Sequence, residues 1–310
     1  MIPKRIIRDV GYEIIKKATY TIPQELISAI RYATDTEAGI AKRHLETLIV
    51  NHNEAIKNRI SVCGDTGFNA FFIRLGNVEI ENGVRGMEES LKEAIKKLVD
   101  DGVLRSSTVN PVTHQNTGIN MGPYLPYFDY VFDPDVDYVE IIASLAGAGT
   151  EVFATRFRSL LTADGILGVK KFVIDSVVEA SKFGASCPPN IVGVGIGGTA
   201  STAMKIAKRA AILRPVDARH PDTAIAKLEA ELIDALNKTG IGSMGMGGNI
   251  TVFDIHIECA PAHIAGFPLA VSSQCPAARL AVIRIKADGT VEHLDQPEWR
   301  KWFTWKWTHE

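Results

Sequence analysis

Gly193-Val194-Gly195-Ile196-Gly197-Gly198 is the stretch that decides between two fold classes for this chain. It satisfies the GxGxxG pattern at the end of a short apolar run, precedes an Ala-rich helical segment, and has Asp217 about 20 residues further on. A dinucleotide-binding turn looks like this, but the flanking sequence lacks a steady βαβ alternation. The pattern therefore favours an α+β fold in which the glycines allow close packing, with their N–H groups near a metal centre or an anionic substrate.

The rest of the chain supports a mixture of helices and strands. Apolar residues at helical spacing predict helices through most of the first 60 residues and over 91–99, 169–185 and 199–212. Asp222 is a predicted N-cap, and its helix ends at Gly240. Strands are predicted over 127–132, 136–145, 191–196, 250–257, 269–273 and 280–285. We expect an α+β (mixed α/β) fold with a helical N-terminal part packed with mixed sheets, and no Rossmann domain.

The chain has no internal repeat or flexible linker, so we expect one catalytic domain over 1–290. The segment 291–310 holds all four tryptophans, at 299, 302, 305 and 307. Tryptophan combines a large apolar area with a polar N–H group. This tail either folds back onto its own chain or docks a partner subunit or a second copy.

Composition excludes several functions. The chain has 310 residues, 46% of them hydrophobic, and 34 basic against 36 acidic residues give a net charge of -2. This balance offers no general attraction for nucleic acid or an anionic membrane. There is no uninterrupted run of 18 apolar residues and no signal-peptide pattern in the first 17 residues, so we expect neither a membrane span nor secretion. Four cysteines are too few for a disulfide scaffold, which favours the cytoplasm.

Three of the four cysteines have neighbours that suit chemistry better than packing. Cys63 lies in Val62-Cys63-Gly64-Asp65-Thr66-Gly67, Cys187 precedes two prolines, and Cys275 is followed four positions later by Arg279. Cys259 is interpreted as an ordinary small buried residue. No CxxC pair supports zinc, whereas three thiolates favour a soft metal or an iron–sulfur cluster. Three protein ligands would leave one iron open to substrate.

Five ordered motifs indicate a family. They are Cys-x-Asp-Thr-Gly at 63–67, Asn-Thr-Gly-Ile-Asn at 116–120, Cys187-Pro188-Pro189 with the glycine run after it, Leu-Arg-Pro with Arg-His-Pro at 213–221, and Cys-x-Ala-Ala-Arg at 275–279. From about residue 10 to 290 the chain resembles the α subunit of the iron–sulfur hydro-lyases, L(+)-tartrate dehydratase and the class I fumarases.

The resemblance implies a [4Fe-4S] cluster with one open iron, held by Cys63, Cys187 and Cys275. It places Asp65, Arg105, His263 and a glycine of the 147–149 turn, taken as Gly147, near a 2-hydroxy dicarboxylic acid. Arg105 suits two-point recognition of a carboxylate. A β subunit would supply the groups that remove the C–H proton, since nothing in these 310 residues is left to encode it. We expect a hetero-oligomer such as α2β2 and little activity from this chain alone.

Departures from the family pattern bear on the substrate. Gly64 stands where the family usually has Gln, Pro276 stands where an aromatic residue often follows the third cysteine, and Ala146 stands where fumarases typically have Lys. Ala146 and the Arg-His-Pro motif resemble tartrate dehydratases. We therefore expect dehydration of L(+)-tartrate to oxaloacetate and water first, a fumarate hydratase α subunit second, and another hydroxy-acid dehydratase third. A nicotinamide-linked oxidoreductase that uses the glycine run and a non-catalytic scaffold subunit remain open alternatives.

Overall fold

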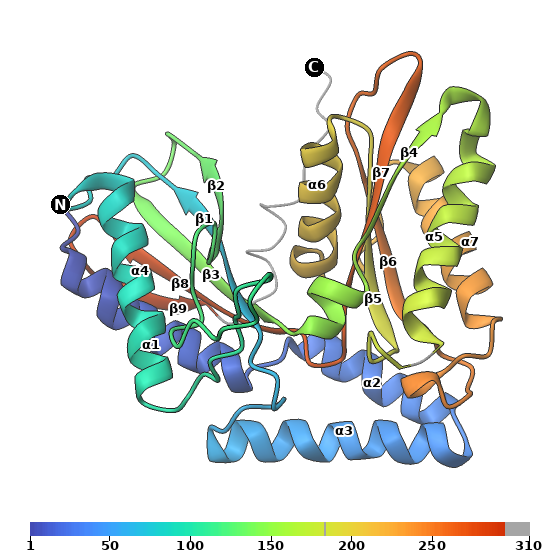
Figure 1. The fold of residues 1–310 in the computed structure, drawn as a ribbon, viewed down its shortest axis with the longest axis horizontal. Coiled ribbons are helices and arrows are strands. Elements are labelled where there is room, and N and C mark those ends of the chain that lie inside the picture. The colour runs from blue at the N-terminus through green and yellow to red at the C-terminus, as the bar shows by residue number, and fades with distance from the viewer. Residues whose placement is uncertain (183, 295–310) are drawn as a thin grey trace. The chain divides into compact units, whose positions relative to one another are not determined.

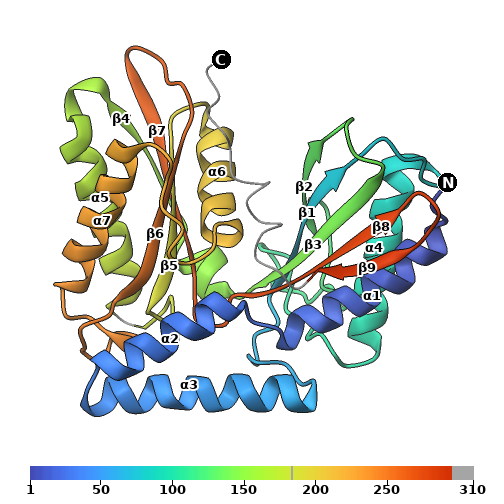
Figure 2. The same cartoon turned by 180° about the vertical axis from the view of Figure 1, so that it is seen from behind.

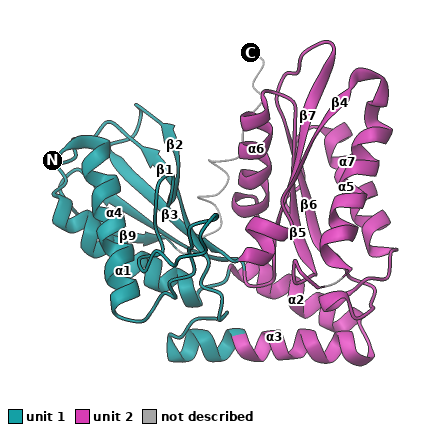
Figure 3. Cartoon of the chain, in the orientation of Figure 1, with its two compact units in different colours: residues 1–22, 52–147, 278–296 teal, residues 23–51, 148–277, 297–310 magenta. Residues whose placement is uncertain are grey.

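The computed structural model describes residues 1–182 and 184–294. These residues form two compact units, each assembled from segments far apart in the sequence (Figure 3). Unit 1 contains residues 1–22, 52–147 and 278–294, and unit 2 contains residues 23–51, 148–182 and 184–277. Helices and mixed sheets make up both units, which confirms the α+β prediction.

Unit 1 is built on a five-stranded sheet with the strand order β2-β1-β3-β8-β9. β1 pairs in parallel with β2, and all the other pairs are antiparallel. Helices α1 (Lys4–Tyr20) and α4 (Gly83–Asp100) cover one face of the sheet (Figure 1). The strands are β1 (Phe68–Leu75), β2 (Tyr127–Phe132), β3 (Tyr138–Ala146), β8 (Arg279–Lys286) and β9 (Val291–Leu294).

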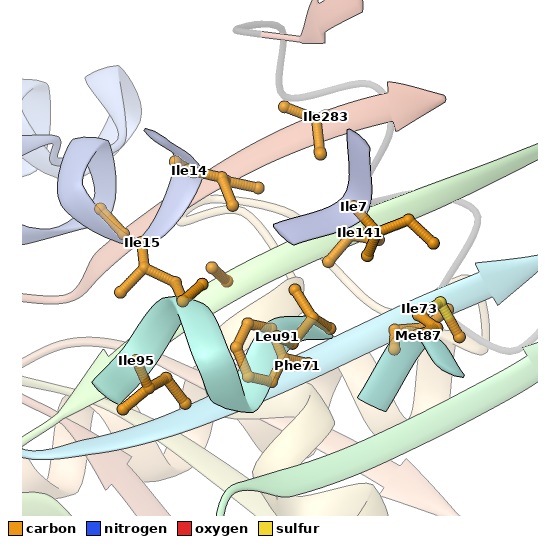
Figure 4. Close-up of a cluster of buried hydrophobic side chains, with 14 of the residues drawn as sticks. Ile7, Ile14, Ile15, Phe71, Ile73, Met87, Leu91, Ile95, Ile141 and Ile283 are labelled. Carbon is orange, nitrogen blue, oxygen red and sulfur yellow. The ribbon is translucent and has the colours of Figure 1, made fainter. Parts of the chain in front are cut away.

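The core of unit 1 lies between these two helices and the sheet (Figure 4). α1 contributes an apolar stripe at helical spacing, and α4 contributes a second stripe with the same period. Alternate residues of the strands face them, as the two-residue period of a β-strand requires. The labelled members in Figure 4 are Ile7, Ile14, Ile15, Phe71, Ile73, Met87, Leu91, Ile95, Ile141 and Ile283.

Unit 2 has three layers around a four-stranded sheet with the order β4-β7-β5-β6. α6 (Ala200–Leu213) lies on one face, and α5 (Gly165–Ser181) and α7 (Thr223–Asn237) lie on the other (Figures 1 and 2). β7 is antiparallel to both its neighbours, so this is not a doubly wound parallel sheet. The strands are β4 (Arg156–Leu161), β5 (Asn190–Ile196), β6 (Val252–Cys259) and β7 (Gly266–Gln274).

The remaining helical segments are short or lie outside these layers. Unit 2 also contains α2 (Gln24–Thr36) and the first part of α3 (Gly39–Asn58), whose last turns belong to unit 1. A π-helical turn spans Gly149–Phe153, and 3-10 turns span Thr162–Asp164 and Ser243–Gly245.

The glycine run packs β5 against α6. A Cβ atom on Gly193 would lie 2.0 Å from the carbonyl oxygen of Ala207, and one on Gly195 would lie 2.0 Å from that of Ala203. Close packing is therefore the role of these two glycines, as expected from the sequence. The N–H groups of the other two glycines donate to the backbone carbonyls of Pro268 and Pro261, at 2.9 and 3.1 Å. These two donors are not available to the phosphates of a dinucleotide or to another bound anion.

Local signals placed several elements correctly. β2 has the predicted bounds, and the side chain of Asp222 accepts hydrogen bonds from the backbone of Ala224 and Ile225 at the start of α7. No helix in the described ranges is both long enough and apolar enough to span a bilayer. The first four residues of the predicted tail form β9 and pair with β8, and the four tryptophans lie outside the described residues.

Candidate functional site

Unit 1 presents Cys63 on a short loop between α3 and β1. The loop is fixed at both ends, because the N–H of Val62 donates to the carbonyl of Thr19 at 3.0 Å and the side chain of Asn120 donates to that of Gly67 at 3.0 Å. Ser61 Oγ donates to the carbonyl of Cys63 at 2.8 Å. The thiol is half-buried. A thiol held on a fixed, partly accessible loop can bind a metal without rearrangement of the fold.

Arg105 lies beside this loop. Its Nη1 donates to the carbonyl oxygen of Gly64 at 2.9 Å, and its backbone N–H donates to Thr66 Oγ1 at 3.0 Å. Arg105 is exposed, and the hydrogen bond to Gly64 uses Nη1 of its guanidinium. The side chain can therefore both anchor Gly64 and offer N–H groups to a carboxylate.

Asp65 lies directly against Gly147. A Cβ atom built on Gly147 would be 2.7 Å from Asp65 Oδ2, so only glycine lets the backbone approach this carboxylate so closely. Gly67, with φ +67°, makes a similar approach to the carbonyl of Ala146. Unit 1 thus gathers Cys63, Asp65, Arg105 and Gly147 at one end of its sheet, where β1 begins and β3 ends.

Unit 2 brings Cys187 and Cys275 together through Asn190. Asn190 Nδ2 donates to the carbonyls of Ser186 and Gln274, the residues before the two cysteines, at 2.8 and 3.4 Å. Its Oδ1 accepts from Ser186 Oγ at 2.9 Å. The pairing of β5 with β7 places Ile191 opposite Gln274, so the antiparallel register sets this arrangement. Cys187 has a φ of +52°, which is a strained backbone conformation for any residue other than glycine.

Cys259 is the last residue of β6, at the other end of the unit 2 sheet. Burial raises the pKa of its thiol to about 12, with Glu258 and Asp222 adding to the effect, so the thiol stays protonated at neutral pH. A protonated thiol is a poor metal ligand. In the described residues no group of three or more His, Cys, Asp or Glu side chains is placed to hold a metal ion.

His263 is not brought near Cys187 and Cys275. It bridges to Gly266 at the start of β7, whereas Cys275 follows the last residue of the same strand. A nine-residue strand spans about 26 Å at roughly 3.3 Å per residue. The ring Nδ1 of His263 accepts from the N–H of Ala265 at 3.2 Å, inside its own turn. Within one copy of unit 2, this histidine and the two cysteines lie at opposite ends of the sheet.

Sequence reasoning missed Asn190, which is buried and links the residues before both cysteines. Its only sequence signal is its place between the Cys-Pro-Pro motif and an apolar run, where a buried strand would not favour Asn. The sequence analysis named Asn120 and Thr66 only as members of motifs and gave them no individual role. In the structure both make hydrogen bonds that fix the Cys63 loop.

Comparisons with known proteins place the sequence in a family. A sequence model described as fumarate hydratase (Fumerase) matches residues 8–284, so the chain belongs to the fumarate hydratase family. It is a hydro-lyase of that family.

Curated relatives are more specific in name. A Methanocaldococcus jannaschii protein named "Putative L(+)-tartrate dehydratase subunit alpha" is 38% identical over 284 residues, which cover 91% of this chain and 98% of that protein. The L(+)-tartrate dehydratase subunit alpha of Escherichia coli strain K12 is 34% identical over 274 residues, or 88% of each chain. The protein of that name in Shigella sonnei has the same identity and coverage.

Proposed function

We propose that the chain is the α subunit of a [4Fe-4S]-dependent hydro-lyase that dehydrates a 2-hydroxy dicarboxylic acid, with L(+)-tartrate as the substrate and oxaloacetate and water as the products. One observation carries the proposal: Asn190 ties together the two residues that precede Cys187 and Cys275. Cys187 and Cys275 follow the two tied residues, and their thiols are soft ligands of the kind that bind an iron–sulfur cluster. Cys63 is the proposed third ligand.

When bound, a cluster with three thiolate ligands supplies a Lewis-acidic iron with an open position. The residues of this chain do the rest of the binding. Arg105 offers N–H groups to a substrate carboxylate while Nη1 holds the loop. Asp65 is fixed against Gly147, so its carboxylate can accept a hydrogen bond from the substrate in one orientation.

The relatives are named as α subunits, which supports a β subunit as the partner of this chain in a hetero-oligomer such as α2β2. The β subunit would supply the groups that remove the C–H proton. We place the complex in the cytoplasm, where thiols stay reduced. We propose a catalytic domain over 1–290 and a Trp-rich tail over 291–310 that serves for docking or as an interface, with its first four residues paired to β8.

If His263 serves the reaction, it must serve a cysteine site other than that of its own chain, because β7 holds it about 26 Å from Cys275. Its surroundings suit contact with another copy. Leu161 and Ile264 are 67% and 90% exposed, and Thr162 joins them by donating its hydroxyl to the carbonyl of Ile264 at 2.7 Å. Exposed apolar side chains grouped in this way are typical of protein interfaces.

The test is anaerobic reconstitution of the chain with iron and sulfide, followed by iron analysis and visible absorbance. Wild type should gain about four irons per chain, and replacement of Cys63, Cys187 or Cys275 by Ser should lower this number and the absorbance. Cys259→Ser is the matched control, because that thiol is protonated and lies at the opposite end of its sheet. Iron retained by all three ligand variants, or lost from the control alone, would sink the proposed ligand set.

Activity is then measured with and without the β subunit on L-tartrate, D-tartrate, meso-tartrate, malate and fumarate. We expect L-tartrate to be used best and activity to need the β subunit. Full activity of this chain alone would contradict the two-subunit proposal. A preference for fumarate or malate would favour the second candidate, a fumarate hydratase α subunit, which the description of the matching family supports.

Mixed complexes test His263. A complex that contains both His263→Ala and Cys275→Ser chains should recover activity above that of either variant alone, because one wild-type site can form between the two kinds of copy. No recovery would contradict a contribution from another copy.

A further inference from the structure

Among the buried polar side chains of unit 1, Arg279 and Asn69 have donors and acceptors that no described residue satisfies. Arg279 is 2% exposed, and its Nε and Nη1 have no hydrogen-bond partner among the described residues. Asn69 is 3% exposed, and its Nδ2 and Oδ1 also have no hydrogen-bond partner among the described residues. Buried polar groups without partners are rare in folded proteins, and a buried charge without a partner is costlier still. The pair can therefore offer these donors and acceptors to a ligand of matching chemistry.

The sheet register places the two side chains in one row. Leu145 of β3 is paired with Asn69 of β1 on one side and with Arg279 of β8 on the other. Residues directly opposite each other across antiparallel strands point to the same face, about 5 Å apart. Asn69 and Arg279 thus flank Leu145 on one face of the sheet.

Arg214 shows how the same chain treats a buried guanidinium that has a structural role. It is 4% exposed, and Nη1 contacts Glu229 Oε1 at 2.8 Å and Glu258 Oε1 at 3.4 Å. Nη2 donates to the carbonyl of Ala218 at 2.8 Å. Among the described residues Arg279 has no such carboxylate partner, in contrast to Arg214.

That position is beside the candidate site. Gly147, which contacts Asp65, lies two residues beyond Leu145, and Gly67 lies two residues before Asn69. We propose that Arg279 and Asn69 form a subsite for the hydroxycarboxylate end of the substrate that does not react. This inference rests on the proposed function and names a substrate-selecting pair within it.

The donors and acceptors of the pair match that end of tartrate. The Nε and Nη1 hydrogens of Arg279 can bind the two oxygens of one carboxylate. Asn69 Oδ1 can accept from the neighbouring hydroxyl, which tartrate has and malate and fumarate lack, while Nδ2 donates to the carboxylate. A site built to bind a hydroxyl discriminates strongly against an analogue without it, because its polar atoms are then left unpaired.

The first test is stability without substrate, measured on the chain assembled with its β subunit. Arg279→Met removes an unpaired buried charge and should raise the thermal midpoint by about 2–4 °C. Arg214→Met is the matched control and should lower it, because Glu229 and Glu258 lose their partner. Asn69→Asp supplies a carboxylate beside Arg279 and should also raise the midpoint. A loss of stability in both Arg279→Met and Asn69→Asp would show that the pair already has structural partners and would overturn the proposal.

The second test is ligand affinity, measured in the same complexes as the shift in thermal midpoint with L-tartrate, malate and succinate. Asn69→Val, with a β-branched side chain that suits a strand, should weaken L-tartrate about tenfold more than succinate, because both ligands lose the Nδ2 donor and only tartrate loses the acceptor of its hydroxyl. Arg279→Met and Asn69→Asp should weaken all three ligands. Equal effects of Asn69→Val on tartrate and succinate would refute the subsite. Ligand shifts that follow the predicted pattern in a complex without dehydratase activity would refute the proposed function and leave the subsite standing.

Discussion

Replacement of Gly193 by Ala tests whether the glycine run is a packing device. The new Cβ would lie 2.0 Å from the carbonyl oxygen of Ala207, 2.5 Å from the amide nitrogen of Ala211 and 2.9 Å from the Cβ of Ala211. Two of these three contacts are with helix backbone, which cannot rotate away. α6 must therefore move from β5 by about 1.5 Å to restore an ordinary separation of ~3.5 Å. Such a gap forfeits much of the packing at this interface, and we expect a loss of about 3 kcal/mol, the upper end for an overpacked core.

The assay is urea unfolding of the complex, followed by circular dichroism, with thermal unfolding beside it. A loss of about 3 kcal/mol should lower the thermal midpoint by about 6–12 °C. Gly122→Ala is the control, because no atom lies within 4 Å of its Cβ position and its backbone is not in the left-handed region. A Gly193→Ala protein as stable as wild type would refute the packing argument, and saturable binding of a nicotinamide nucleotide that this variant loses would favour the dinucleotide-binding alternative.

Three further predictions follow from single side chains. Burial lowers the pKa of His52 to about 4, so the folded state keeps this ring neutral while the unfolded state takes up a proton below pH 6.5. The free energy of unfolding should therefore fall by about 2 kcal/mol from pH 7 to pH 5. His52→Leu should remove this pH dependence when chemical unfolding is measured at both pH values. A Cβ atom at Gly64 would have open space around it, so the stability of Gly64→Gln should stay within about 0.5 kcal/mol of wild type. The relative kcat/KM values for tartrate, malate and fumarate should change. Unchanged relative values would contradict a substrate contact at this position. Asn190→Ala should lower iron content after reconstitution and cost about 2 kcal/mol of stability, whereas Ser176→Ala, which removes only a hydroxyl bonded to its own helix, should retain full iron content.

The sequence predicted elements with strong local signals and missed those whose pattern depends on their neighbours. Asp222 marked the start of α7, because its side chain caps the helix with no help from the rest of the fold. β4 (Arg156–Leu161) was not predicted, because as an edge strand it exposes four of its six residues and shows no apolar alternation. β1 (Phe68–Leu75) is buried on both faces apart from its ends, so its near-continuous apolar run carries no two-residue period. β9 has only four residues, too few for a periodic signal.

The candidate site shows the same division between local and distant information. The loop from Cys63 to Gly67 was readable, because its residues lie side by side and its hydrogen bonds reach nearby elements. The sequence could not predict that Arg279 is buried without a hydrogen-bond partner for Nε and Nη1, because its surroundings depend on the residues that β1 and β3 place beside it. The motif placed Arg279 four positions after Cys275, and only the structure shows that its guanidinium is buried with Nε and Nη1 unpaired among the described residues.

Distance along the chain misleads most at His263. It precedes Cys275 by 12 positions, and Cys187 precedes Cys275 by 88, so sequence proximity alone would pair His263 with Cys275. The fold reverses this order, because β7 is straight and separates its two ends by about 26 Å, while its antiparallel pairing with β5 returns the chain to Cys187. An extended strand therefore separates two residues by a larger distance than a helix with the same number of residues does. The same argument makes recovery of activity in mixed His263→Ala and Cys275→Ser complexes the most direct measure of whether this histidine acts at all.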